Sequence, residues 1–129
     1  MKKYILLILK LIAAIIMLQT LFFKFTGAQE SIDLFTKIAG SNEAYMRIGT
    51  GVFELIASIL LFTPKKTWLG ALLTTGLMTG AIMSHLTILG IEHDGDGGTL
   101  FICAIITFIS GIILLIFNRK SIPIVGNKL

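Results

Sequence analysis

The chain has 129 residues, of which 55% are hydrophobic and only 14% are charged, with a formal net charge of +4. A water-soluble domain of this size needs a polar shell around its core, which this composition cannot supply, so lipid must solvate most of the surface. The positive charge does not indicate a nucleic-acid partner, because the basic residues form no stripe with interleaved aromatic side chains.

Four apolar stretches follow one another along the chain, and each is long enough to cross about 30 Å of hydrocarbon as a helix. They cover residues 4–23, 46–62, 68–89 and 100–117. A backbone in lipid must satisfy its own hydrogen bonds, and four strands cannot close a barrel, so we expect helices. The first stretch is long for the apolar part of a signal peptide, so we expect it to remain as a span. The sequence therefore predicts an all-α integral membrane protein, a four-transmembrane-helix bundle forming a single domain over residues 1–129.

The connection between the first two spans contains an amphipathic segment. Apolar residues from Ile32 to Ala39 recur at helical spacing, Ser31 is a suitable N-cap, and Gly40 can end a helix. We predict a short interfacial helix over residues 31–39 that lies on the membrane surface.

Small residues recur along the third span. Gly76, Gly80 and Ser84 are spaced by four residues, and this spacing lets helix backbones approach closely. The spacing predicts that they pack the helices of the bundle together, and it leaves open that they form the contact face of a homo-oligomer.

Basic residues gather in alternate connections. The connection 90–98 has no Lys or Arg but holds three acids, Glu92, Asp94 and Asp96. The basic residues at the amino end, in the connection 63–67 and after the fourth span are Lys2, Lys3, Lys65, Lys66, Arg119, Lys120 and Lys128. By the positive-inside rule we expect a multi-pass protein of the bacterial plasma (inner) membrane with both termini in the cytoplasm.

Two ionisable residues lie within the predicted spans. Glu54 and His85 each cost about 2.5–3.5 kcal/mol to insert, so they are candidates for a functional role. At a rise of 1.5 Å per residue, Gln19, Glu54 and His85 lie at similar depth in the outer third of the membrane. We predict a polar pocket with Glu54 and His85 at its base and with Lys24 and Arg47 at its rim. The alternative is a buried Glu–His or Glu–Arg pair that only fixes the helix register.

Other chemistry has little support in the sequence. His85, His93, Asp94 and Asp96 have no spacing typical of a zinc site. No Ser-His-Asp arrangement, phosphate-binding loop or c-haem motif is visible. Cys103 is the single cysteine, which excludes an internal disulfide, and we expect it to be a small buried apolar residue. We therefore predict no self-contained catalytic centre and no metal site.

Four segments carry a resemblance to a known family. They are residues 18–25 (LQTLFFKF), 47–57 (RIGTGVFELIA), 68–71 (WLGA) and 80–86 (GAIMSHL). In these segments, and over nearly the whole chain, the sequence resembles the DoxX-like family of small four-helix membrane proteins. The resemblance implies a four-helix bundle and an association with quinone-linked redox chemistry, because the family takes its name from a subunit of a thiosulfate:quinone oxidoreductase.

Three functions follow from these observations. The first is a membrane component of a quinone-linked oxidoreductase system, with a quinone bound near Glu54 and His85. Any electron transfer would need a redox partner protein or the quinone itself, because the chain has no haem, flavin or iron–sulfur motif. The second is a non-catalytic scaffold that docks another membrane protein through its glycine faces and its surface helix. The third is a small-molecule carrier, which the lack of a repeat or a discontinuous span disfavours.

Overall fold

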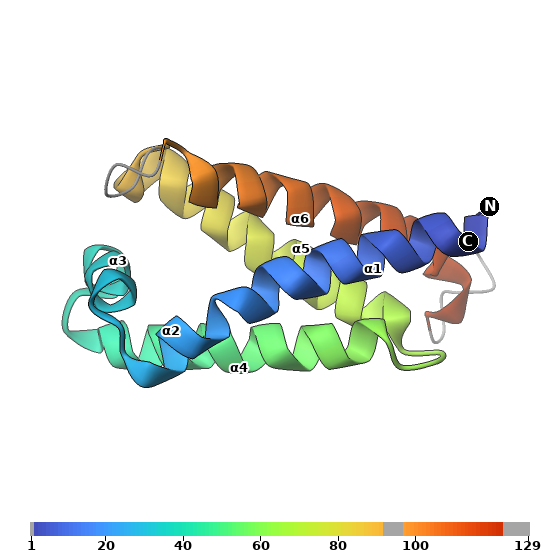
Figure 1. Cartoon of the computed structure of the whole chain (residues 1–129), viewed down its shortest axis with the longest axis horizontal. Coiled ribbons are helices and arrows are strands. Elements are labelled where there is room, and N and C mark those ends of the chain that lie inside the picture. Colours follow the sequence, from blue (N-terminus) through green and yellow to red (C-terminus); the bar gives the residue numbers. More distant parts are fainter. Residues whose placement is uncertain (1, 92–96, 123–129) are drawn as a thin grey trace.

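The computed structural model describes residues 2–91 and 97–122, and the described part is entirely helical. The elements are α1 (Lys2–Gln19), α2 (Leu21–Thr26), α3 (Gln29–Ala39), the 3₁₀ turn η1 (Gly40–Asn42), α4 (Glu43–Leu61), α5 (Thr67–Ser84), the π-helical turn η2 (His85–Leu89), α6 (Thr99–Phe117) and the 3₁₀ turn η3 (Arg119–Ser121). The long helices form a ring, in which α1 packs on α4 and α6, and α5 packs on the same two helices (Figure 1). The three acids of the predicted connection 90–98 fall within residues 92–96, which lie outside the described residues.

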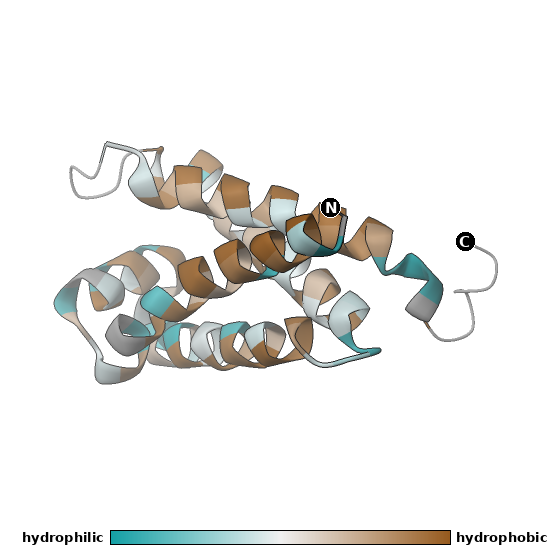
Figure 2. Ribbon diagram, turned by 45° about the vertical axis from the view of Figure 1, so that its right-hand side comes forward, coloured by the Kyte–Doolittle hydropathy of each residue, from teal (hydrophilic) through white to brown (hydrophobic). Residues whose placement is uncertain are grey.

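The outer surface of the bundle is mainly apolar along the spans. Four segments are long and apolar enough to cross a membrane, and they are Lys3–Thr26, Ser31–Leu61, Thr67–Leu89 and Thr99–Phe117. Large apolar side chains such as Ile15, Ile59 and Ile109 point outward and are more than half exposed. Figure 2 shows hydrophobic residues along the spans and hydrophilic residues mainly at the connections. These features confirm the predicted multi-pass, four-helix membrane protein, because lipid is the solvent that suits such a surface.

The first span is broken near its end, which the sequence did not predict. Thr20 separates α1 from α2, and its Oγ1 donates a hydrogen bond to the carbonyl of Met17 over 3.1 Å. Such bonds from a threonine to its own helix backbone bend helices. After the bend, α2 packs along α4 (Figure 1), and this brings Lys24 next to the second span.

The predicted helix in the first connection is present as α3. It begins at Gln29, with Ala28 at the N-cap position, so the prediction of Ser31 as the N-cap is wrong. Gly40 follows the helix, as predicted, with a φ of 59° that favours glycine. The apolar face turns towards the bundle, where Phe35 is 7% exposed and α3 packs on α4 and η2. The helix therefore covers one end of the bundle.

The glycines of α5 show where the helices are in close contact. A Cβ atom on Gly70 would lie 2.6 Å from the backbone nitrogen of Leu61 on α4, and one on Gly111 of α6 would lie 2.8 Å from Oγ1 of Thr75. By contrast, a Cβ atom on Gly76 or Gly80 would meet nothing within 4 Å. The prediction that Gly76 and Gly80 pack the helices of this chain together is therefore wrong. Helix α5 touches its neighbours near Gly70 and diverges from α4 further along.

The bundle thus has two unlike ends (Figure 1). At the turn end, which we define by the α4–α5 turn at residues 62–66, the helices pack tightly and Leu61, Ala71 and Leu114 are fully buried. At the opposite end, which we call the α3 end, the pair α5–α6 separates from α2 and α4, and α3 covers the space between them.

Candidate functional site

A cavity of about 620 Å³ lies inside the α3 end of the bundle. Its walls come from α1, α2, α3, α4, α5, η2 and α6, and most of the lining side chains are apolar. Gly76 and Gly80 form part of its wall on α5, where the absence of side chains leaves space. Small-molecule sites in proteins usually measure about 300–1,000 Å³ and are mostly apolar with a few placed polar groups. The cavity has these properties.

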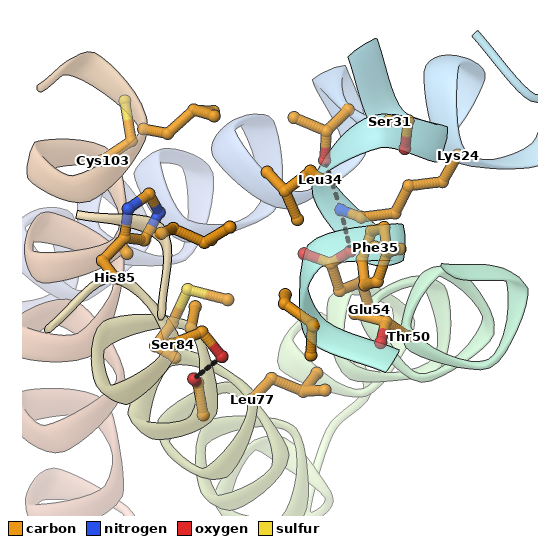
Figure 3. Close-up of a pocket in the computed structure, with 18 of the residues that line it drawn as sticks. Lys24, Ser31, Leu34, Phe35, Thr50, Glu54, Leu77, Ser84, His85 and Cys103 are labelled. Carbon is orange, nitrogen blue, oxygen red and sulfur yellow. Dashed lines mark hydrogen bonds and ion pairs between the residues drawn. The ribbon is translucent and has the colours of Figure 1, made fainter. Parts of the chain in front are cut away.

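The first polar group of the cavity is an ion pair on its α2–α4 side (Figure 3). Lys24 Nζ lies 2.5 Å from Oε1 of Glu54 and donates a second hydrogen bond to Oγ1 of Thr20 over 2.8 Å. The side chains of Lys24 and Glu54 are only 12% and 5% exposed. The partner of Glu54 is thus Lys24, whereas the alternative named a His or an Arg. Lys24 reaches into the bundle instead of remaining at a rim.

Arg47 lies beside the cavity but does not line it. Its side chain donates hydrogen bonds to the backbone carbonyl of Lys24 and, over 2.9 Å, to Oε2 of Glu43. One turn further along α4, Gly51 allows Phe25 of α2 to pack closely, since a Cβ atom there would lie 2.7 Å from the ring. Arg47 and Gly51 therefore hold α2 against α4, which places Lys24 beside Glu54.

The second polar group is His85, on the opposite side of the cavity (Figure 3). His85 is the first residue of the π-helical turn η2 and is 4% exposed. Its Nδ1 lies 2.9 Å from the carbonyl oxygen of Gly90, and its ring stands edge-on to Phe101 with the centroids 5.6 Å apart. Cys103 of α6 lines the cavity on the same side and is only partly buried.

The structure therefore brings four of the five predicted pocket residues to one cavity. Gln19, Lys24, Glu54 and His85 line it, and Arg47 does not. Thr20 was not among the predicted residues, although its spacing of four residues from Lys24 places both on one helical face. The contribution of α3 was also not predicted, and this helix lines the cavity with Ser31, Leu34, Phe35 and Ile38. Among the described residues, no group of three or more His, Cys, Asp or Glu could hold a metal ion.

The fold and the cavity define a small four-helix membrane protein with an apolar cavity and polar groups on two of its sides. A model of the DoxX family matches residues 5–87, which is more than half of the chain. The chain belongs to the DoxX family, as its sequence indicated. The matched range contains Lys24, Glu54 and His85 but ends before α6, so it is narrower than the resemblance over nearly the whole chain that we expected. No curated protein and no solved structure matches the chain significantly.

Proposed function

We propose that this protein is a membrane component of a quinone-linked oxidoreductase system and that it binds a quinone ring in the cavity. The observation that carries the proposal is an apolar cavity between a buried Lys24–Glu54 pair and a buried His85. A quinone presents flat apolar faces and polar oxygens at opposite edges. Apolar walls with hydrogen-bonding groups on two sides complement such a molecule.

Access to the cavity from lipid supports a ligand of this kind. Gly76 and Gly80 line the cavity from α5 and are exposed, and so is Gln19 at the end of α1. Since these positions lie within the apolar segments that can cross a membrane, we expect this side of the cavity to face hydrocarbon. A ligand with a long apolar tail can enter sideways from the bilayer and leave its tail in lipid.

The orientation in the membrane is a further part of this proposal. The start of α1, the α4–α5 turn and η3 lie at the turn end of the bundle (Figure 1). They carry Lys3, Lys65, Lys66 and Arg119, and basic residues favour the cytoplasmic side. With both termini in the cytoplasm of a bacterial cell, the cavity lies in the outer half of the plasma membrane. A partner protein supplies or accepts the electrons.

The test compares ligand binding in two glycine variants. A decyl-substituted benzoquinone should raise the melting temperature of the wild-type protein in nanodiscs. Gly80→Leu places a side chain in the cavity and should abolish this rise. Gly49→Leu is the matched control, because a Cβ atom on Gly49 also meets nothing within 4 Å but Gly49 does not line the cavity. No rise in the wild type would contradict the proposal.

A scaffold remains the competing function, and the exposed Gly76 and Gly80 favour it because another helix could pack against them. The same variants separate the two functions. A scaffold requires that Gly80→Leu loses a co-purifying membrane protein while the quinone has no effect on the wild type. Quinone binding requires that the ligand effect is present in purified protein without any partner.

A further inference from the structure

The hydrogen bond of His85 fixes which of its ring nitrogens carries the proton. The carbonyl oxygen of Gly90 can only accept, so His85 Nδ1, 2.9 Å away, must be the donor. In a neutral imidazole the other nitrogen, Nε2, is then an acceptor with a free lone pair. The π-helical turn makes this contact possible, because it ends at Leu89 and the next residue, Gly90, takes a φ of 82° that favours glycine.

The accepting nitrogen is buried and has no partner in the described part of the chain. His85 is 4% exposed, and Nε2 makes no hydrogen bond to any of the described residues. The two ring nitrogens point in nearly opposite directions, so Nε2 faces away from Gly90. Buried polar atoms are almost always hydrogen-bonded, and those that are not need an explanation. A donor that belongs to a ligand in the adjoining cavity explains this one.

The ion pair on the other side offers the complementary group. The ammonium group of Lys24 has three hydrogens, and Glu54 and Thr20 take two of them. The third ammonium hydrogen can bond an oxygen of the ligand at the edge opposite to the hydroxyl. The cavity thus presents an acceptor at His85 and a donor at Lys24.

We infer that the cavity selects a ligand that donates a hydroxyl hydrogen to His85 Nε2, so it binds a quinol or another phenol in preference to the quinone. A quinone has only acceptor oxygens and leaves Nε2 without a donor. This inference rests on the proposed function, because it concerns the form of the ligand bound at the same site.

Two probes that do not cycle between quinone and quinol separate hydroxyl donation from ring shape. A decyl-substituted 4-methoxyphenol keeps one hydroxyl donor and one ether acceptor, and its methyl ether replaces the hydroxyl with a second acceptor. Binding to wild-type protein in nanodiscs is measured by calorimetry, and the signal of Gly80→Leu is subtracted to correct for partition into lipid. The phenol should bind about fivefold more tightly, as expected for one hydrogen bond between neutral groups.

Two variants of His85 test whether its Nε2 is the acceptor of the hydroxyl hydrogen of the phenol. His85→Asn keeps an N–H near the position of Nδ1 for Gly90 and removes the acceptor at Nε2, so the two probes should bind equally. His85→Gln places an amide oxygen near the position of Nε2 and should retain a preference for the phenol. Cys103→Ala changes the same wall of the cavity without removing the acceptor and should keep the full preference.

The outcomes distinguish this inference from the proposed function. Equal binding of the two probes to the wild type would overturn the inference and leave the cavity as a ligand site. A preference that persists in His85→Asn would also overturn it, because another acceptor such as Glu54 would then receive the hydroxyl. Binding of neither probe, and of no quinone, would overturn both proposals.

Discussion

The two ends of this bundle use the same residue type for opposite purposes. At the turn end, Gly70 and Gly111 let helices touch, and a Cβ atom on either would overlap a neighbouring helix. At the α3 end, α5 has diverged from α4, and a Cβ atom on Gly76 or Gly80 would meet no neighbouring atom within 4 Å. A glycine in a membrane helix can therefore create a contact or a cavity, and the course of the neighbouring helix decides which.

The polar residues follow the same division. At the turn end the buried polar side chains are hydroxyls that bond backbone carbonyls, such as Thr74 to Gly70 within one helix and Thr67 to Leu61 across the α4–α5 turn. At the α3 end they are ionisable, and Lys24, Glu54 and His85 face one cavity. Buried charges are costly in a membrane, so their concentration around the cavity is the strongest indication of a binding role.

The largest effect is expected from breaking the ion pair. Lys24→Met leaves Glu54 buried without its partner, and such a loss typically costs about 3–5 kcal/mol of folding free energy. The measurement is reversible unfolding in mixed micelles. The double variant Lys24→Met/Glu54→Leu should recover most of the loss, because it removes both charges. If the single variant is as stable as the wild type, the pair does not form in the membrane.

A smaller effect on the free energy of unfolding should distinguish the glycines of the turn end from those of the α3 end. Gly70→Ala forces α4 and α5 apart, and overpacking of this kind costs about 1–3 kcal/mol. Gly76→Ala meets no neighbour, and it should be neutral or should stabilise by up to about 1 kcal/mol because alanine restricts the unfolded chain. The same unfolding assay measures both variants. Equal destabilisation would show that α5 remains packed on α4 beyond Gly70.

The smallest effect concerns the bend between α1 and α2. Thr20→Val keeps the side-chain shape but loses the hydrogen bonds to Met17 and Lys24, which should cost about 0.5–1.5 kcal/mol. Thr79→Val is the control, since Thr79 is exposed and bonds only the carbonyl of Thr75. If the two variants lose the same stability, Thr20 has no particular role in placing Lys24.

Much of the fold could be predicted because lipid imposes simple constraints. Length and apolarity predicted the four spans, and the cost of burying charge singled out Glu54 and His85 among the residues of those spans. Amphipathic spacing predicted α3, but the predicted start at Ser31 was wrong. The helix begins at Gln29, and the N-cap residue Ala28 has no side chain that could have marked this start in the sequence.

The missed features all depend on which segments meet. Glu54 pairs with Lys24 over 30 positions of sequence, and this depends on the bend at Thr20. The spacing of Gly76 and Gly80 shows that a backbone can be approached, but it does not show that another helix of the chain approaches it. Likewise, the depth of Arg47 could be estimated from the sequence, but its hydrogen bond to the backbone of α2 could not.

The proposed function depends above all on a ring-shaped ligand that binds between the Lys24–Glu54 pair and His85. The most direct measurement is an experimental structure in lipid nanodiscs with the decyl-substituted benzoquinone or its phenol analogue added. We expect flat density in the cavity, with an oxygen of either ligand near Lys24, the hydroxyl of the phenol within hydrogen-bonding distance of His85 Nε2, and an apolar tail that leaves past Gly76 and Gly80. A collapsed cavity, with the side chains of α3 packed directly on α5 and no added density, would contradict the proposal.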